Sequence, residues 1–372
     1  MAAETTPSSV LLAGGGTAGH VSPLLSLADC LRRRDPAVAI TALGTETGLE
    51  ARLVPERGYP LMTVPKVPLP RKPSGDLLRL PGSLRAAVAA AERAIEESGA
   101  QVVVGFGGYV STPAYLAARR RHVPIVVHEQ NARAGVANRV GARMTRFVAT
   151  TFASTKLAHA TAIGMPLRRE IAQLDRVAVR PEALAHFGLE PHWPTVLVTG
   201  GSLGAQRLNS TFAARVAALR ASGVQVLHLT GAGKEFVADN SGPGAPYVVA
   251  PYADRMDLAY AAADLVVARA GANTVCELTA VGLPAVYVPL PIGNGEQRFN
   301  AADVVAAGGG LLVEDAALTP AWVDDTLVPL VSDRDRMDAM AAASAATGER
   351  GADELLADMV AAAFTESLAG QR

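Results

Sequence analysis

The feature that most constrains the fold is an apolar run that breaks into glycines and then continues as a helix. Val10 to Ala13 is apolar, Gly14, Gly16 and Gly19 follow at the spacing G-x-G-x-x-G, and a helical stretch at 22–34 comes next. This order is typical of the first strand, loop and helix of a Rossmann-type domain. Glycines let backbone N–H groups approach an oxyanion, and a helix N-terminus adds positive potential. The loop therefore predicts an anion site, and His20 within it adds a group that titrates near neutral pH.

The same pattern occurs a second time. An apolar strand at 194–199 leads into Gly200, Gly201 and Gly204, and a helix is expected up to Leu219. A chain of 372 residues is long for one domain and natural for two. The repeat predicts two Rossmann-like, doubly wound α/β domains, each with its own anion loop.

A passage containing glycine and proline at 162–169 marks the expected domain boundary. The alanine-rich stretch 341–368 is expected to be helical and to cross back onto the first domain. We therefore expect a first domain of residues 1–167 with the C-terminal helix at about 345–372, and a second domain of residues 168–344.

Composition excludes several classes of protein. The net charge of −1 gives no electrostatic reason to bind nucleic acid. The two cysteines, Cys30 and Cys276, stand in apolar helical contexts, which argues against disulfides and thiolate metal sites and indicates a reducing compartment. The seven histidines show no ligand spacing, so no metal is expected. With no signal-like N-terminus and no long apolar run, we expect a cytoplasmic chain that does not span a membrane.

The passage 58–82 has two interpretations, which the sequence leaves open. It holds Lys66, Arg71, Lys72 and Arg79 against one acid, with leucines at 77, 78, 80 and 84 between them. It is either a solvated loop before a helix at 84–97, or a basic and apolar patch that lies on an anionic membrane surface. In the second case each basic residue adds about 1 kcal/mol of binding free energy.

Polar and glycine residues follow several predicted strands. In the first half they occur at 105–111 and 128–131, and in the second half at 269–277 and 290–300. Loops at the carboxyl ends of parallel strands form the ligand crevice of open α/β sheets. The basic run at 119–121 is interpreted as a solvated helix end.

Two other classes of enzyme, dehydrogenases and hydrolases, also use glycine loops of this kind. A nicotinamide dehydrogenase needs an acidic residue about 20 residues past the first loop, a place that Glu46 can fill. A single cofactor, however, leaves the loop at Gly200 without a role. A hydrolase would use Ser202 as its nucleophile. Because a helix is expected directly after this loop, Ser202 is better interpreted as a hydroxyl donor to a phosphate at a helix N-terminus.

Taken together, six stretches resemble the MurG family of peptidoglycan N-acetylglucosaminyltransferases: 14–20, 105–109, 128–131, 164–168, 200–205 and 269–300. The resemblance implies a GT-B fold, with two Rossmann-like domains facing a central cleft. It implies transfer of GlcNAc with inversion from UDP-N-acetylglucosamine to the C4 hydroxyl of MurNAc in undecaprenyl-diphosphate-linked lipid I, giving lipid II, without a cofactor. It also implies a peripheral place on the cytoplasmic face of the membrane, with anionic inner-leaflet lipids and cell-wall synthesis and division proteins as partners.

Donor-binding residues are implied by the same resemblance. Ser202 would hold the phosphates, Arg168 would neutralise charge on the departing UDP, and Glu277 would accept hydrogen bonds from the ribose. Ala253 and Met256 would meet uracil, and Gln297 would bind sugar hydroxyls. Glu296 stands where some relatives are expected to have glutamine. The full implied set is Arg168, Gly201, Ser202, Ala253, Met256, Ala272, Thr274, Glu277, Glu296, Gln297 and Asn300.

For the acceptor side, the resemblance assigns catalysis to His20, Glu129 and Asn131. Acceptor binding is assigned to Gly15, Gly16, Thr17, Gly19, Gly107, Gly108, Tyr109 and Asn131. Our hypothesis is that His20 is the general base, because an imidazole pKa of about 6.5 suits proton transfer near neutrality. Alternatively His20 binds the acceptor diphosphate, and Glu129 or a water is the base. Other functions that share the donor motifs are a GT-B transferase with a soluble acceptor, a UDP-sugar epimerase and a non-catalytic UDP-sugar sensor.

Overall fold

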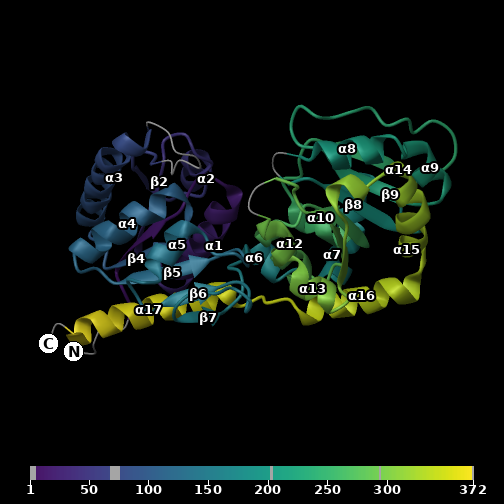
Figure 1. The fold of residues 1–372 in the computed structure, drawn as a ribbon. Coiled ribbons are helices and arrows are strands. Elements are labelled where there is room, and N and C mark those ends of the chain that lie inside the picture. Colours follow the sequence, from purple (N-terminus) through teal and green to yellow (C-terminus); the bar gives the residue numbers. More distant parts are fainter. Residues whose placement is uncertain (1–5, 68–75, 202–203, 293–294, 371–372) are drawn as a thin grey trace. The chain divides into compact units, whose positions relative to one another are not determined.

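The computed structural model describes residues 6–67, 76–201, 204–292 and 295–370, with the backbone alone for residues 76–80. The chain divides into two compact units (Figure 1). Unit 1 comprises Met1–Arg168 together with Arg350–Arg372, and unit 2 comprises Arg169–Glu349.

Unit 1 is built on a seven-stranded sheet with the order β3-β2-β1-β4-β5-β6-β7, in which all neighbours are parallel. The central strands are apolar runs because helices cover both of their faces. The strands are β1 Ser9–Ala13, β2 Ala39–Gly44, β3 Leu61–Thr63, β4 Val102–Gly105, β5 Ile125–Glu129, β6 Val148–Thr150 and β7 Ala160–Ala162.

The helices of unit 1 cover the two faces of this sheet. Alternate residues of β1 point to opposite sides, so Leu12 packs with α1 and α17, whereas Leu11 packs with α3 and α4. The C-terminal helix α17 contributes Leu356 and Phe364 to the first of these two cores. The helices are α1 Ala18–Arg34, α2 Glu50–Glu56, α3 Asp76–Ser98, α4 Gly108–Arg120, α5 Val136–Gly141 and α17 Ala352–Gly370.

Unit 2 has a six-stranded sheet with the order β10-β9-β8-β11-β12-β13, again with parallel neighbours. Its strands are β8 Thr195–Thr199, β9 Gln225–Leu229, β10 Tyr247–Ala250, β11 Leu265–Ala268, β12 Ala285–Tyr287 and β13 Gly310–Leu312. Its helical segments are α6 Arg169–Ala172, α7 Arg176–Phe187, α8 Gln206–Ala213, α9 Val216–Ala221, α10 Met256–Ala262, α11 Ala272–Ala280, α12 Glu296–Asn300, α13 Ala302–Ala306, η1 Asp315–Ala317, α14 Pro320–Trp322, η2 Val323–Leu327, α15 Val328–Ser332 and α16 Arg334–Ala346.

Both units are doubly wound α/β sheets, as the repeated strand, loop and helix predict. In each sheet the strand order reverses at one point, between β1 and β4 in unit 1 and between β8 and β11 in unit 2. Ligands of open α/β sheets bind outside the carboxyl ends of the strands at such a point. The glycine loops after β1, β4 and β8 and the loop after β11 therefore stand where a site is expected.

Several helix boundaries differ from the sequence predictions. Helix α1 begins at Ala18 instead of residue 22, because Thr17 takes an extended conformation as the N-cap and the helix starts directly after it. Helix α3 begins at Asp76 instead of residue 84. The stretch 170–187 is two helices, since the Asp175 carboxylate accepts hydrogen bonds from the backbone N–H groups of residues 177 and 178 and starts α7 anew. The stretch 341–368 is likewise broken between α16 and α17.

Candidate active site

His20 lies in the first turn of α1, at the switch point of the unit 1 sheet. Its Nδ1 atom is 3.1 Å from the carbonyl oxygen of Gly15 and 3.1 Å from Oγ1 of Thr17. A carbonyl oxygen can only accept a hydrogen bond, so the neutral ring carries its proton on Nδ1. The Nε2 atom then has a lone pair that can accept a proton.

The glycine turn after β4, formed by Gly107 and Gly108, packs against the His20 imidazole. Gly107 has φ of +91°, and a Cβ atom at this position would lie 3.3 Å from His20 Nε2. Gly108 has φ of +78°, and its Cβ atom would lie 2.7 Å from the carbonyl oxygen of Gly15. Glycine is therefore needed here both for the left-handed backbone and for the close approach of the two loops. The structure brings together the residues that the sequence predicted from two separate glycine motifs.

The electrostatic surroundings of His20 keep its ring neutral. Burial lowers the pKa of His20 below its ordinary value of 6.5, while the negative charges of Glu129 and Glu50 and the Gly15 carbonyl oppose this shift. At pH 7 the imidazole is therefore predominantly unprotonated, which is the state that a general base needs.

Glu129 ends β5, is buried, and uses both carboxylate oxygens within its own loop. Oε1 accepts a hydrogen bond from the backbone N–H of Asn131 at 2.9 Å. Oε2 accepts from the backbone N–H of Gly135 and from the side-chain amide of Asn138, both at 2.9 Å. This carboxylate fixes the 129–138 loop, on which the half-buried Asn131 is carried.

Two buried residues of this loop system were missed in the sequence. The hydroxyl of Tyr115 donates to Oδ1 of Asn138 at 2.8 Å, and the Asn138 amide also donates to the carbonyl oxygen of His128 at 3.0 Å. Gly105 makes room for this tyrosine, because a Cβ atom there would lie 2.1 Å from the Tyr115 hydroxyl. The glycine that ends β4 therefore has a packing role.

A third missed residue, Glu50, lies beneath the first glycine loop. It is fully buried and accepts a hydrogen bond from the backbone N–H of Gly16 at 2.8 Å. A cavity of about 90 Å³ opens beside it, and among its lining groups are Lys66 and Tyr109. The exposed Tyr109 ring faces the Lys66 ammonium at 5.5 Å.

The two remaining implied acceptor residues lie at the start of α1. Thr17 is the N-cap of this helix, and Gly19 lies in its first turn.

The glycine loop of unit 2 has the same construction. Gly201 has φ of +77° and donates its backbone N–H to Oγ1 of Thr199 at 3.2 Å. Gly204 has φ of +64°, and a Cβ atom there would lie 2.0 Å from the carbonyl oxygen of Thr230. Ser202, which the resemblance assigns to the donor phosphates, lies outside the described residues.

The loop after β11 and helix α11 carry the next group of implied donor residues. Ala272 and Thr274 lie in the first turn of α11, and Glu277 follows one turn later. Oε2 of Glu277 accepts a hydrogen bond from the Tyr260 hydroxyl at 2.8 Å, which orients the carboxylate. Ala253 is buried before α10, and the half-buried Met256 is the first residue of that helix.

The remaining implied donor residues lie on or near α12. Glu296 begins this helix, and Oε1 of Gln297 accepts a hydrogen bond from the backbone N–H of Leu290 at 3.0 Å. Asn300 ends α12, is buried, and donates to the carbonyl oxygen of Ala270 at 3.3 Å. This bond ties α12 to the loop after β11. Arg168 is half-buried and is the last residue of the first segment of unit 1.

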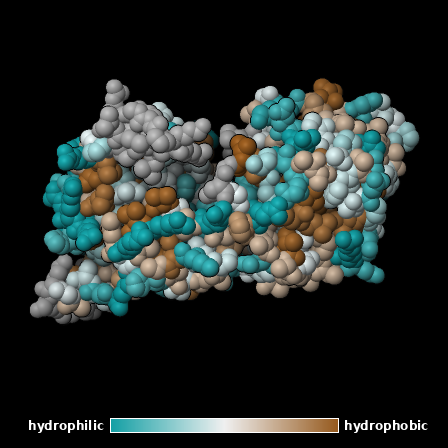
Figure 2. All heavy atoms as spheres, viewed as in Figure 1, coloured by the Kyte–Doolittle hydropathy of each residue, from teal (hydrophilic) through white to brown (hydrophobic). Residues whose placement is uncertain are grey.

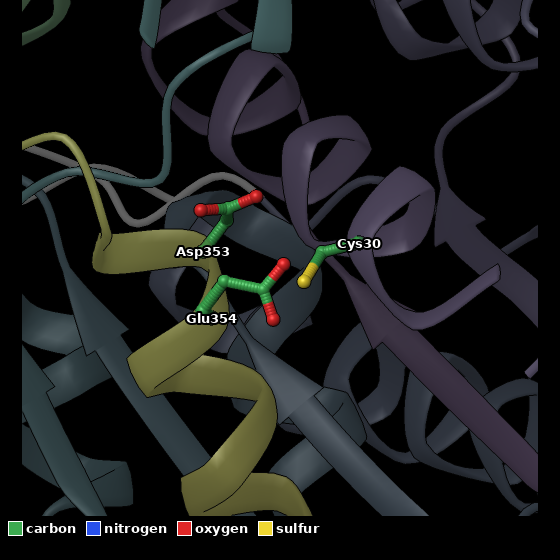
Figure 3. Close-up of side chains that lie close together, drawn as sticks. All are labelled: Cys30, Asp353 and Glu354. Carbon is green, nitrogen blue, oxygen red and sulfur yellow. The ribbon is translucent and has the colours of Figure 1, made fainter. Parts of the chain in front are cut away.

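One cluster outside these loops contains three groups that bind metals in other proteins. Cys30 on α1 faces Asp353 and Glu354 on α17 (Figure 3). Both carboxylates, however, form ion pairs with arginines, Asp353 with Arg33 at 2.7 Å and Glu354 with Arg34 at 2.6 Å. Burial and the neighbouring acids raise the pKa of the Cys30 thiol to about 12. The cluster joins two helices of unit 1.

Comparison with known proteins places this geometry in a family. Residues 10–150 match the glycosyltransferase family 28 N-terminal domain, and residues 195–356 match the C-terminal domain of that family. The first match holds the loops around His20 and Glu129, and the second holds the glycine loop at Gly200 and helices α11 and α12.

Two curated relatives carry the name UDP-N-acetylglucosamine–N-acetylmuramyl-(pentapeptide) pyrophosphoryl-undecaprenol N-acetylglucosamine transferase. The protein of Streptomyces avermitilis is 58% identical over 352 residues, covering 94% of this chain and 97% of the relative. That of a Nocardioides species is 59% identical over 353 residues, with the same coverage.

Among solved structures, MurG of Acinetobacter baumannii matches with a TM-score of 0.77 and 28% identity, over 95% of this chain and 99% of that one. The GT-B architecture expected from the motifs is thereby confirmed as the fold class. The chain belongs to glycosyltransferase family 28, and within it to the MurG family of N-acetylglucosamine transferases.

Proposed function

We propose that this chain transfers GlcNAc from UDP-GlcNAc to the C4 hydroxyl of MurNAc in lipid I, forming the β-1,4 link of lipid II and releasing UDP. The observation that carries the proposal is the 58% identity, over 94% of this chain, to a relative named for that transfer. The family matches at 10–150 and 195–356 include both glycine loops and every implied site residue except Arg168.

His20 is the group best suited to accept the proton of the acceptor hydroxyl. In inverting transfer, the C4 oxygen attacks the anomeric carbon of GlcNAc as the bond from that carbon to the UDP oxygen breaks. The proton of the hydroxyl must leave as the new bond forms. The Nε2 lone pair of His20 can take it, because Nδ1 is already occupied by the Gly15 carbonyl.

Glu129 is less suited to that role. Three donors at 2.9 Å already use both of its carboxylate oxygens, so protonation would break the bonds that hold its loop. We assign Glu129 to the positioning of Asn131 and to the electrostatic stabilisation of a protonated His20. Asn131 then contacts the acceptor through its side-chain amide.

Unit 2 holds the donor in this proposal. Glu277, oriented by Tyr260, accepts hydrogen bonds from the ribose, and the side-chain NH₂ of Gln297 donates to a sugar hydroxyl, since its oxygen is engaged by Leu290. The loop at Gly201 and the guanidinium of Arg168 stabilise the diphosphate leaving group. Each charge-assisted hydrogen bond contributes about 1.5–3 kcal/mol, so several must act together.

The assay that tests this function uses radiolabelled UDP-GlcNAc and a soluble lipid I analogue. We expect label in the disaccharide product, and a turnover number at saturating acceptor that falls at least about 100-fold in His20→Ala. The affinity for UDP-GlcNAc should stay unchanged, and the exposed His192→Ala serves as the matched control. Release of UDP without transfer, or an epimerised sugar, would refute the transferase proposal. Unchanged turnover with a raised KM would instead make His20 an acceptor-binding residue.

We also propose that the chain binds the anionic surface of the membrane peripherally. Among the described residues, no helix is long and apolar enough to cross a bilayer. Within the passage 58–82, where the basic and apolar patch was expected, the side chains of residues 68–80 lie outside the described part of the structure. Another surface of unit 1 supports the proposal, namely a cavity of about 570 Å³ that combines apolar side chains with Arg119, Arg143 and His159. Arg146 also lines it and forms an ion pair with Glu366 of the same lining.

This cavity is suited to a phospholipid headgroup because basic and apolar groups occur together. In the view of Figure 2, apolar residues gather over α3 to α5 beside hydrophilic ones. The sequence predicts a solvated helix end for the basic run 119–121. Arg119 lies exposed in the last turn of α4, where it lines this cavity, and Arg120 and Arg121 form ion pairs with Glu92 and Glu96.

Co-sedimentation with phosphatidylglycerol vesicles tests the membrane proposal. We expect the wild type to bind these vesicles, to bind phosphatidylcholine vesicles much less, and to lose most binding in Arg119→Ser/Arg143→Ser and in Leu77→Ser/Leu78→Ser/Leu80→Ser. The exposed pair Arg334→Ser/Arg336→Ser of unit 2 makes the same change of net charge as the arginine variant and should bind as the wild type does. Equal sedimentation of the wild type with both lipids would contradict the proposal.

A further inference from the structure

The carboxylate of Glu50 lies beneath the first glycine loop, and both of its oxygens accept hydrogen bonds. Its Oε2 atom accepts the backbone N–H of Gly16 at 2.8 Å. Its Oε1 atom accepts the backbone N–H of Thr45 at 2.9 Å and the Thr45 hydroxyl at 2.7 Å. These bonds join the loop after β1 to the end of β2. One N–H of the predicted anion loop is thus already bound to a protein carboxylate.

Three glycines make room for this side chain. A Cβ atom on Gly15 would lie 2.3 Å from Oε1 of Glu50, one on Gly48 would lie 2.1 Å from Oε2, and one on Gly44 would lie 2.4 Å from Cγ. Gly15 has no left-handed φ that would by itself require glycine. The reason for glycine at this position is therefore the space that the Glu50 carboxylate occupies.

The bond to Gly16 is adjacent to the one that orients His20. Glu50 holds the N–H of Gly16, and the carbonyl of the preceding residue, Gly15, holds Nδ1 of His20. We propose that Glu50 is a positioning residue for proton transfer, which fixes the loop that orients the His20 ring and places a negative charge behind it. The inference rests on the proposed role of His20 as the base.

The negative charge of Glu50 has a function in the proposed proton transfer to His20. When His20 takes the acceptor proton, the ring becomes an imidazolium, and a nearby anion stabilises that form over the neutral ring. The charged groups that act on the ring are Glu129 from β5 and Glu50 from α2, and both raise the pKa of His20 against the effect of burial. Lys66 lines the cavity next to Glu50 and is the nearest cation in its lining. The hydrogen bonds to Gly16 and Thr45 lower the pKa of Glu50 itself and keep it ionised.

Glu50→Gln tests the proposal, because it removes the charge and keeps the shape. We expect turnover to fall at least about tenfold, with the KM for UDP-GlcNAc unchanged. The acid limb of the kcat/KM profile should move to lower pH by about half a unit or more, since loss of the anion lowers the pKa of His20. Glu50→Asp retains the charge and should keep the acid limb of the wild type although its rate is reduced. Glu92→Gln makes an equal change of charge elsewhere in unit 1. It should change neither the turnover nor the position of the acid limb.

Titration of the histidine rings by NMR in the intact protein gives a readout that does not depend on activity. The His20 resonance, assigned by its loss in His20→Gln, should titrate at lower pH in Glu50→Gln than in the wild type. A His20 pKa that is the same in both proteins would overturn the inference. If His20→Ala retains full turnover, the base assignment fails instead, while this titration still reports whether Glu50 acts on the ring.

Discussion

The two ring nitrogens of His20 have different surroundings, and under the proposed role of His20 as the base this difference sets the pH dependence of the activity. Nδ1 is bound to a carbonyl, so the acid form is made by protonation of Nε2. Burial lowers the pKa of His20 below 6.5. In the proposed role His20 must be unprotonated, so we expect activity to fall as the pH falls through this lowered pKa.

We therefore expect the acid limb of kcat/KM to lie below pH 6.5. Measurement of kcat/KM with the soluble acceptor between about pH 5 and pH 8 gives the position of the limb. An acid limb of kcat/KM that lies above pH 7 would contradict the conclusion that burial lowers the pKa of His20. The residual activity of His20→Gln should lack the limb altogether.

Two glycines of the donor loop offer a matched pair of substitutions. Both have positive φ, but a Cβ atom on Gly204 would lie 2.0 Å from the backbone oxygen of Thr230, whereas one on Gly201 would have no atom of the described residues within 4 Å. Gly201→Ala should cost about 1–2 kcal/mol of strain, and Gly204→Ala should cost more, because backbone must move as well. Urea unfolding of unit 2 and the Kd for UDP measure the difference. Equal effects would show that the approach to Thr230 is unimportant.

The site residues that the sequence identified belong to local motifs. His20, Gly107 and Glu129 each follow an apolar strand within a few residues, so their place at the carboxyl edge of a sheet follows from the pattern. Glu50 and Asn138 were missed because their roles depend on contacts between elements. Glu50 meets Gly16 across 34 residues of sequence, and a lone glutamate in the first turn of a short helix looks like a solvated one.

At the scale of elements, the pairing of α1 with α17 closes one face of the unit 1 sheet. Leu356 on α17 is fully buried in the core with Leu24 and Leu27 of α1, while its neighbour Leu355 is 45% exposed. The ion pairs at the ends of these helices are partly exposed, so each contributes about 1 kcal/mol or less. Apolar burial therefore holds α17 in place.

Leu356→Ala should lower the free energy of unfolding of unit 1 by about 2–5 kcal/mol, because it leaves a cavity in this core. Leu355→Ala removes the same atoms from an exposed position and should change it by about 0.5 kcal/mol or less. Urea denaturation followed by circular dichroism compares the two. A loss of similar size in both variants would mean that α17 is not packed as described.

The central strands were predictable from the sequence, and so was the edge strand β10, but the edge strands β3, β7 and β13 were not. Strands β1, β4, β5, β8 and β11 are buried on both faces and therefore appear in the sequence as continuous apolar runs. Strands β3, β7 and β13 have three residues each, and all three residues of β7 are exposed. Such short strands take their conformation from the neighbour they pair with, which a local pattern does not show.

At the scale of the whole molecule, each unit contains one fully buried histidine whose ring the proposed chemistry does not use. His128 in unit 1 and His228 in unit 2 are both held neutral by burial, with the pKa lowered to about 4. In the unfolded chain the pKa of histidine returns to 6.5. Below that pH the unfolded state binds one more proton per histidine than the folded state, so stability falls as the pH falls.

We expect each histidine to lower the free energy of unfolding of its unit by about 2 kcal/mol between pH 7 and pH 5. Urea unfolding at the two pH values measures the effect. In His228→Gln, unit 2 should be less stable at pH 7, because bonds to Tyr247 and Asn209 are lost, but its pH dependence should be flatter. A pH dependence equal to that of the wild type would contradict the assignment.

The path of the chain makes unit 1 discontinuous, since Arg350–Arg372 returns to the unit that Met1–Arg168 began. During synthesis on a ribosome, unit 2 is complete before the last helix has been made. The face of the unit 1 sheet that includes Val10 and Leu12 stays without α17 until residues 352–370 have been made. A nascent chain stopped before residue 350 therefore exposes this apolar face to chaperones, and unit 1 is completed only after unit 2.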